Sequence, residues 1–474
     1  DYQSKMSTKN ISHLIVLFCI LLVILNFVNC RKQNLITNSS AKLDFSTDTV
    51  LFDTIFTTIG STTKYFKLYN NNNGKINISS VQLASGTNSS YRINVNGEAG
   101  INFENIELEQ GDSIFVFVEV TIDPNNSNNP LVVEDSILFL TNGNLQKVVL
   151  NAWGQDAYFH VKEIINGNSI WNNDKPHVIY NYCIVDSSYT LTIPAGTEVR
   201  GHSNSILYVY KSALQVNGSL GEPVTFKQDR TEDFLLYDAD STSGQWRGIW
   251  FFQPLNSSIE YANISNAIIG IQVDTAESGN LVQLNSVAVQ NSLYASILTQ
   301  GANVNAVNCL FGNSSQFCGF ISLGGEINFE HCTFGNYWQG QRNSALFVLK
   351  DYYNYQNIPQ PRPFSAANFT NCIFYGSNSN EVVIDTLSRE LTAQTPVMNF
   401  TNSLLKLEDS INNSVFFNNC FNNLNPEFND PVHWDFSIPS TSFVIDKGAP
   451  STVLIDLIGT SRTNGNDLGC FEHI

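Results

Sequence analysis

The sequence predicts an all-β protein of two domains, a β-sandwich followed by a solenoid of stacked strands. Apolar and polar residues alternate in short runs between residues 41 and 157, and a repeat of about 23 residues runs through residues 158–474. The 474 residues are 42% hydrophobic and 14% charged, with a net charge of −18. That much apolar material excludes a wholly disordered chain, and the negative charge argues against a nucleic-acid partner.

The beginning of the chain has the pattern of an export signal. Residues 14–25 form an unbroken apolar run, preceded by Lys5 and Lys9. As a helix this run spans about 18 Å, which is too short for a hydrocarbon core of about 30 Å. A basic start followed by a short apolar stretch is typical of a secretory signal peptide.

Cys30 follows the apolar run and resembles the acylated cysteine of bacterial lipoproteins. The resemblance implies a signal peptide over residues 1–30 that ends at this cysteine, a lipid anchor on Cys30 and a linker over residues 31–40. It also implies that the anchor holds the protein in the bacterial outer membrane, at either the periplasmic or the cell-surface leaflet. The alternative is a plain signal peptide with an incidental cysteine.

Residues 41–157 predict the β-sandwich. Runs such as 65–69 and 114–120 alternate with the period of two that half-buried strands require. Turn residues such as Asn-Asn-Asn-Gly at 71–74 separate these runs. Short strands with turns at such intervals are typical of an antiparallel sandwich.

Four segments of this domain resemble the immunoglobulin-like modules called choice-of-anchor D, namely 66–70, 76–78, 116–124 and 150–155. The resemblance implies an immunoglobulin-like β-sandwich. It also implies a spacer or adhesion module, which carries no catalytic residues.

An internal repeat predicts the architecture of residues 158–474. Small or medium-sized residues recur in one register at positions 262, 287, 309, 332, 372, 403 and 420, and the first steps are 25, 22 and 23 residues long. Such a period suits one solenoid turn of three short strands, stacked about 4.8 Å above the last turn. The pattern resembles the right-handed parallel β-helix family, which implies an apolar interior and ladders of Asn side chains at the bends.

Four cysteines share the repeating register: Cys309, Cys332, Cys372 and Cys420. Their Cβ atoms on neighbouring turns would lie near the strand spacing of about 4.8 Å, beyond the roughly 3.5–4.5 Å of a disulfide. We therefore expect buried free thiols. The sequence leaves open the pairing of three further cysteines: Cys183, Cys318 and Cys470.

Two places could suggest a metal. His331 and Cys332 are consecutive, so in a strand they face opposite sides and cannot share one ion. Asp233, Asp238 and Asp240 belong to an acidic segment with the opening rhythm of a calcium-binding EF-hand loop, although it lacks the required Gly and the final Glu. A solvated insertion loop is our main interpretation there, with Ca²⁺ as the alternative, and we expect no other cofactor.

The longest departure from the repeat lies between positions 332 and 372, where an extra segment spans residues 350–363. Insertions in solenoids often form the binding surface. Aromatic rings stack on the C–H faces of sugars while polar side chains bind hydroxyls, so the candidate glycan-binding residues are Trp338, Arg342, Tyr352, Tyr353, Tyr355 and Arg362. The alternative is a loop that packs its tyrosines onto the solenoid wall.

The β-helix family includes polysaccharide lyases and hydrolases, so the resemblance also raises an enzymatic alternative. Hydrolysis needs two carboxylates about 5–10 Å apart, and the acids of residues 258–345 do not recur at the repeat period. The favoured hypothesis is therefore a non-catalytic cell-envelope lipoprotein that binds a glycan or another envelope component through its β-helix. The alternatives are a lyase or glycoside hydrolase of β-helix type, and a structural subunit of an outer-membrane protein assembly.

Overall fold

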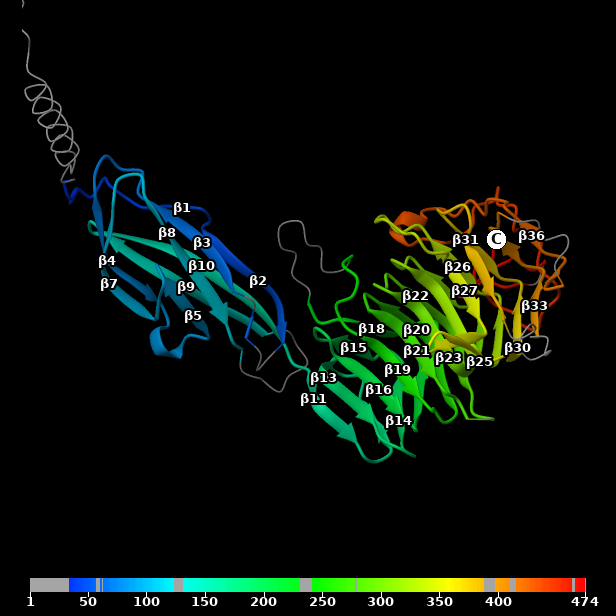
Figure 1. The fold of residues 1–474 in the computed structure, drawn as a ribbon. Coiled ribbons are helices and arrows are strands. Elements are labelled where there is room, and N and C mark those ends of the chain that lie inside the picture. The colour runs from blue at the N-terminus through cyan, green and yellow to red at the C-terminus, as the bar shows by residue number, and fades with distance from the viewer. Residues whose placement is uncertain are drawn as a thin grey trace, which may run out of the picture. The chain divides into compact units, whose positions relative to one another are not determined.

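The computed structural model describes residues 34–473 except 57–59, 62, 123–130, 231–240, 278, 388–396, 409–414 and 463–464. In this described part the chain is all-β, as predicted: it contains strands and two short 3₁₀ helices, η1 (Gly86–Asn88) and η3 (Pro431–His433), and no α-helix (Figure 1). None of its helices is long and apolar enough to cross a membrane. The chain divides into two compact units, Asp1–Gln155 and Asp156–Ile474.

The first unit contains ten strands in two five-stranded sheets. One sheet has the order β1-β3-β8-β5-β6 and the other has the order β2-β10-β9-β4-β7. Of the eight neighbouring strand pairs, β2 and β10 run parallel and the other seven run antiparallel. The strands are β1 (Asp44–Phe45), β2 (Thr49–Phe56), β3 (Lys64–Tyr69), β4 (Ile76–Leu83), β5 (Tyr91–Val95), β6 (Glu98–Gly100), β7 (Asn102–Leu108), β8 (Ser113–Val120), β9 (Leu131–Thr141) and β10 (Asn144–Gln155).

The two sheets of the first unit share one hydrophobic core. Alternate residues of β8 are buried, so Val116 and Val118 face inward while Phe115 and Phe117 face solvent. Phe66 of one sheet contacts Phe139 of the other, with ring centroids 6.2 Å apart, and buried residues of both sheets belong to a single cluster.

Part of the segment expected to be a linker is held by this unit. Leu35 forms a parallel bridge with Lys75, and the backbone N–H of Ile36 donates to the Lys75 carbonyl at 2.7 Å. The chain is therefore already engaged in backbone pairing at residue 35.

The second unit consists of strands β11 to β36. All of them except β28 and β29 join one 24-stranded sheet. The strands are β11 (Tyr158–Ile165), β12 (Ser169–Ile170), β13 (His177–Val185), β14 (Thr190–Pro194), β15 (Glu198–Gly201), β16 (Ile206–Tyr210), β17 (Ala213–Asn217), β18 (Val224–Gln228), β19 (Gly248–Phe252), β20 (Ser257–Ser265), β21 (Ile269–Asp274), β22 (Val282–Gln290), β23 (Ala295–Val307), β24 (Leu310–Gly312), β25 (Phe317–Glu330), β26 (Thr333–Asn336), β27 (Phe347–Lys350), β28 (Tyr352–Tyr355), β29 (Ile358–Pro361), β30 (Phe364–Thr370), β31 (Ile373–Gly376), β32 (Val382–Asp385), β33 (Met398–Thr401), β34 (Leu404–Leu405), β35 (Phe417–Asn418) and β36 (Phe421–Asn422).

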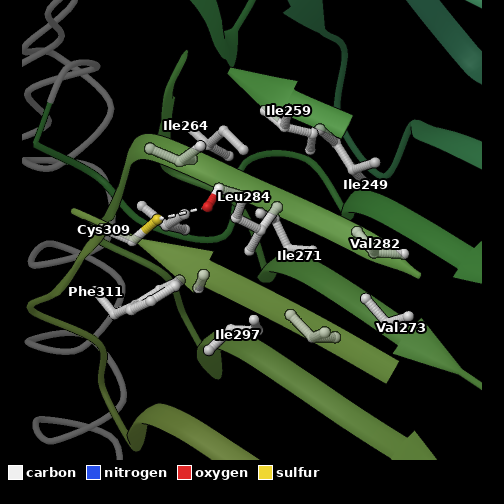
Figure 2. Close-up of a cluster of buried hydrophobic side chains, with 14 of the residues drawn as sticks. Ile249, Ile259, Ile264, Ile271, Val273, Val282, Leu284, Ile297, Cys309 and Phe311 are labelled. Atoms are coloured by element: carbon white, nitrogen blue, oxygen red, sulfur yellow. Dashed lines mark hydrogen bonds between the residues drawn. The ribbon is translucent and has the colours of Figure 1, made fainter. Parts of the chain in front are cut away.

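In this sheet, parallel pairing stacks equivalent residues above one another. We call a set of residues that pair in this way from strand to strand a column. Ile249, Ile271 and Ile297 form one column, on β19, β21 and β23. Ile259 and Leu284 belong to another, on β20 and β22. All five side chains are buried, and Figure 2 shows them within one apolar cluster. Each strand thus covers the apolar side chains of the strand it pairs with.

The repeating positions of the sequence follow one another in this register. Ala262 pairs with Val287, and the later positions each directly precede a paired residue, as at Leu310 and Thr333. The cysteines at these positions are free thiols, and Cys183, Cys318 and Cys470 are free as well. All four cysteines of the shared register are free; Cys309, Cys332 and Cys372 are buried as expected, whereas Cys420 is only half-buried. The Cys309 Sγ lies 3.7 Å from the Leu284 carbonyl oxygen (Figure 2), so the thiol bonds to backbone.

Asparagines occupy the bends because the backbone turns there with positive φ. Asn308 and Asn371 have φ of 54° and 57°, in the left-handed region that Asn tolerates better than most residues. Bend asparagines also bond to one another between strands, since Asn291 Nδ2 donates to Asn266 Oδ1 at 2.7 Å. The predicted Asn ladders are present at these bends.

Candidate functional site

A pocket of about 650 Å³ lies in the second unit where the end of β26 approaches η3. Its walls are aromatic and amide side chains with few other groups. The lining residues are Ser241, Asn291, Asn313, Tyr337, Trp338, Gln339, Gly340, Val432, His433 and Trp434. Two indoles together with several amides form a surface that can stack on a ring and bind hydroxyl groups.

Asn313 holds the two walls of this pocket together. Its Nδ2 donates to the Pro431 carbonyl at 2.7 Å, and its Oδ1 accepts from the backbone N–H of Tyr337 at 2.8 Å. Trp338 directly follows Tyr337, and Trp434 ends η3 with a left-handed φ of 71°. One bend residue therefore positions segments that are far apart in the chain.

Two stacked glycines leave room for the aromatic ring that holds the segment after η3 in place. Gly312 and Gly335 are paired on β24 and β26. A Cβ atom on Gly335 would lie 2.2 Å from the ring of Phe436, and one on Gly312 would lie 2.9 Å from it. The absence of side chains leaves room for the Phe436 ring, which is fully buried. Phe436 thereby fixes Trp434, two residues earlier.

Among the described residues that line the pocket, the imidazole of His433 is the group suited to acid–base chemistry. His433 Nδ1 lies 2.8 Å from Asp430 Oδ2, and the two side chains are 80% and 55% exposed. Burial raises the pKa of Tyr337, which therefore stays neutral. No carboxylate is among the described residues that line the pocket.

The predicted tyrosine insertion forms a hairpin from β28 and β29. Tyr355 pairs with Ile358 across it, and Gln356 and Asn357 at the turn have φ of 48° and 62°. Positive φ at both central residues matches the tight turn that fits the twist of paired strands. Tyr353 lies on the same face as Tyr355 because side chains alternate along a strand. Tyr355 and Ile358 are 61% and 60% exposed, so this face is open.

Tyr352 points away from that open face and anchors the hairpin. Its hydroxyl donates to Asp385 Oδ2 at 2.8 Å, and the Lys350 ammonium lies 4.0 Å from its ring centroid. Arg362 lies over the Tyr353 ring, 5.2 Å from its centroid. Four of the predicted residues are therefore together: Tyr352, Tyr353, Tyr355 and Arg362.

The other two predicted residues are elsewhere. Trp338 lines the pocket described above, in which no hairpin residue takes part. Arg342 is buried and forms a bidentate pair with Glu381, at 2.7 Å and 2.5 Å. The prediction of Arg342 as a glycan-binding residue is wrong, because Glu381 already binds its guanidinium.

An outward-facing aromatic strip was missed by the sequence analysis. Tyr208 pairs with Trp250 and Tyr210 with Phe252, with ring centroids 4.9 Å and 5.9 Å apart. Trp250 Nε1 donates to Asp274 Oδ2 at 2.8 Å. Aromatic residues at alternating positions in 206–210 and 248–252 were the available signal, since the apolar residues between them fill the core.

Two pairs of carboxylates that share a column lie far apart. Asp274 and Asp385 share the column Asp274, Gln300, Ser322, Lys350 and Asp385, four strand steps or about 19 Å apart. Glu260 and Glu330 share a column with Asn285 and Val307 between them, three steps or about 14 Å. Glycosidases need carboxyl groups about 5–9.5 Å apart, so neither pair can hydrolyse a glycoside.

The remaining predicted sites are the His331–Cys332 pair, the cysteine proposed for lipidation and the acidic segment. His331 Nε2 lies 3.0 Å from Asn371 Nδ2, whereas Cys332 Sγ bonds backbone carbonyls, so the two side chains have different partners. Cys30 and the acidic residues Asp233, Asp238 and Asp240 lie outside the described residues. Lipidation and calcium binding there stay predictions.

Comparisons with known proteins show no family. A scan against protein-family models finds no match, and a search of curated proteins finds no similar chain. Among solved structures, a family 123 glycoside hydrolase from Clostridium perfringens, described in a study of glycolipid glycan hydrolysis, is similar at 11% identity with a TM-score of 0.18. The similarity covers 24% of this chain and 26% of that enzyme. A TM-score at that level carries no argument about fold or activity.

Proposed function

We propose that this protein is a non-catalytic cell-envelope lipoprotein that binds a glycan in the pocket between Trp338 and Trp434. The observation that carries the proposal is the pairing of two indoles with amide side chains in one cavity of about 650 Å³. Sugars present apolar C–H faces and a rim of hydroxyls, which such walls match by stacking and hydrogen bonding. A cavity of that volume lies within the usual range for small-molecule sites.

The hairpin supplies a second contact surface in this proposal. Tyr355 is largely exposed and Tyr353 partly so, while the Arg362 guanidinium lies over one face of the Tyr353 ring and adds a cationic donor there. Because Tyr352 is tied to Asp385, the hairpin is held without using its open face. A chain of sugars longer than the pocket could therefore find a second stacking platform on the same unit.

Binding without catalysis is favoured by the placement of the acids. The described pocket lining has no carboxylate, and the acids that share a column are three or four strand steps apart. The lyase or hydrolase alternative would require a pair of carboxylates or a base beside the bound sugar, and the described lining offers the imidazole of His433 alone for that role.

The proposed fold gives these surfaces a rigid support. We infer an immunoglobulin-like sandwich for the first unit, supported by two sheets around one core and by the parallel pairing of β2 with β10. We infer a right-handed parallel β-helix for the second unit, supported by the 24-stranded parallel sheet and its columns. A lipid on Cys30 would anchor the protein in the outer membrane, and the first unit would act as a spacer.

A glycan array tests the proposed binding with the full chain in detergent. We expect binding to at least one envelope polysaccharide, and a loss of affinity of tenfold or more in Trp338→Ala and Trp434→Ala. Trp338→Phe, which keeps an aromatic face, should retain part of the affinity. The double variant Tyr353→Ala, Tyr355→Ala measures the hairpin's share separately.

Three outcomes would contradict the proposal. Binding to no glycan, together with copurification of an outer-membrane complex, would favour the structural-subunit alternative. Release of reducing or unsaturated sugar ends would establish an enzyme. Glycan binding that is unchanged in both tryptophan variants would place the site elsewhere. The anchor is tested by incorporation of labelled fatty acid, which Cys30→Ser should abolish.

A further inference from the structure

A cluster of three different metal-ligating side chains lies at the start of the second unit. His160 and Glu163 are on β11, and Cys183 is on β13. An imidazole nitrogen, a carboxylate oxygen and the thiol sulfur of these residues all lie within 4.8 Å of one another. His160 and Cys183 are buried, while Glu163 is partly exposed.

A bulge in the pairing of β11 with β13 brings these side chains together. Residues three apart on a regular strand point to opposite faces. Between the pairs Val161–Tyr180 and Glu163–Cys183, β13 has one residue more than β11, and Lys162 and Asn181 in this stretch have φ of 51° and 65°. This bulge places Glu163 on the side of His160 and opposite Cys183, with which it is paired. Bulges of this kind commonly re-aim a side chain at a functional site.

The hydrogen bonds around His160 leave one nitrogen directed at Glu163. The carbonyl of Asn172 can only accept, so His177 Nε2, 2.7 Å away, donates to it. In the neutral ring His177 Nδ1 is then an acceptor, and it lies 2.8 Å from His160 Nε2, which must donate. In a neutral His160 ring, Nδ1 thereby carries its lone pair in contact with Glu163 Oε2.

Two acceptors in contact repel each other unless a positive centre lies between them. Trp171 stacks on both imidazoles, with ring centroids 4.4 Å and 4.3 Å away, so the rings are held in these planes. Metal-bound histidines characteristically donate their other N–H to an acceptor that orients them. The chain from His160 through His177 to Asn172 provides that arrangement.

We propose that His160 Nδ1, the Glu163 carboxylate and the Cys183 thiolate bind a divalent transition metal of the zinc type, with His177 as a positioning residue. Mixed nitrogen, oxygen and sulfur donors suit Zn²⁺, which binds at about 2.0–2.3 Å and needs donors roughly 3.3–3.6 Å apart in a tetrahedron. Donors already within 4.8 Å require only small side-chain adjustments. A pocket of about 230 Å³, lined in part by His160 and Glu163, gives the metal and a fourth ligand access.

The competing explanation is a hydrogen shared by His160 and Glu163, with the polar cluster merely closing the end of the apolar core. The two explanations differ in whether an added metal ion binds the Cys183 thiolate. Cobalt reports this directly, because a cobalt–thiolate bond produces charge-transfer absorption that nitrogen and oxygen ligands do not.

The test uses the full chain, stripped with EDTA and titrated with Co²⁺ and then with Zn²⁺. We expect one Co²⁺ with thiolate absorption, its displacement by Zn²⁺, and a higher melting temperature with Zn²⁺ than with EDTA. Cys183→Ser should abolish the absorption, and Glu163→Gln should weaken Co²⁺ binding at least tenfold. Cys420→Ser, which removes a half-buried thiol elsewhere, should change neither.

Absence of thiolate absorption in the unmodified chain would overturn the proposal, as would its persistence in Cys183→Ser. Circular dichroism establishes whether each variant is folded. If Cys183→Ser does not fold, Glu163→Gln decides the question, because its side chain is partly exposed and its replacement keeps the shape. Unchanged metal affinity in that variant would leave the shared hydrogen as the explanation.

Discussion

Arg342 and Glu381 form a bidentate ion pair from which solvent is excluded. Nη1 of Arg342 donates to Oε2 at 2.7 Å and Nη2 donates to Oε1 at 2.5 Å. The two side chains are 2% and 0% exposed. Glu381 also accepts from the backbone N–H of Leu346 at 3.0 Å, so the pair joins the segment before β27 to the segment before β32.

Removing the Arg342 guanidinium should destabilise the second unit strongly. Arg342→Leu leaves the Glu381 carboxylate buried without a counter-charge, which costs about 3–5 kcal/mol of unfolding free energy. Chemical denaturation of the full chain measures this loss. Lys227→Ala is the control, because Lys227 and its partner Glu198 are each 30% exposed, and such pairs contribute about 0–1 kcal/mol. Equal losses in both variants would contradict the assigned role.

A side chain at Gly335 should displace the C-terminal segment from β24 and β26. The added Cβ of Gly335→Ala would lie 2.2 Å from the Phe436 ring, and such overpacking costs about 1–3 kcal/mol. Because Phe436 positions Trp434, glycan affinity should fall as well. Gly221→Ala is the matched control, since no atom lies within 4 Å of its added Cβ. If stability and affinity both survive Gly335→Ala, this ring does not position the pocket wall.

The stacked thiols should resist alkylation in the folded protein. Burial raises the pKa of Cys309 and Cys332 well above the usual range, so little thiolate forms at pH 8. Peptide mapping after brief iodoacetamide treatment should show half-buried Cys420 modified before Cys309 and Cys332. All three should react fully in guanidinium chloride. A disulfide recovered from native protein at any of these positions would contradict the arrangement.

The buried imidazole of His331 should make stability sensitive to acid. Burial, followed by the nearby Arg462 guanidinium, lowers the pKa of His331 from 6.5 to about 3. The unfolded chain therefore binds one more proton between these values. The stabilisation that comes from the neutral, buried His331 is fully present above about pH 6.5. As the pH falls towards 3, the free energy of unfolding decreases by up to about 1.4 kcal/mol per pH unit.

His331→Asn tests this dependence, because Asn occupies the equivalent bends at Asn308 and Asn371 with similar φ. We expect the variant to lose less unfolding free energy than the unmodified protein between pH 6.5 and 4. Glu472 changes the free energy of unfolding in the opposite direction, because burial raises its pKa to about 7. The stabilisation from its protonated form is lost as the pH rises from 4.5 towards 7. It is present in both proteins, so their difference isolates His331. Parallel pH curves would contradict the prediction.

The parts of the fold that depend on local chain geometry could be predicted from the sequence. The recurrence at 262, 287, 309 and 332 predicts the register that the pairing displays, because steps of similar length return equivalent residues to equivalent places. The hairpin insertion was also placed correctly as a departure from the repeat, with its tyrosines together.

The candidate sites depend on side chains that the sequence keeps apart. Nothing near Arg342 indicates that its partner is Glu381, 39 residues later. The sequence prediction groups Trp338 with the tyrosines of the insertion that follows it, yet Trp338 lines a pocket together with Trp434. The cluster of His160 and Glu163 depends on a bulge, which alternation of apolar residues does not reveal.

The sequence by itself determined the all-β class, the repeat and the residues that stack within it, since strand alternation and spacing are properties of a short stretch of chain. Only the tertiary structure decided which side chains meet across strands and at the returning C-terminal segment. Those encounters created the tryptophan pocket, the buried ion pair and the three-ligand cluster. Their physical cause is the closure of long loops, whose ends carry no local signal of the partner they will contact.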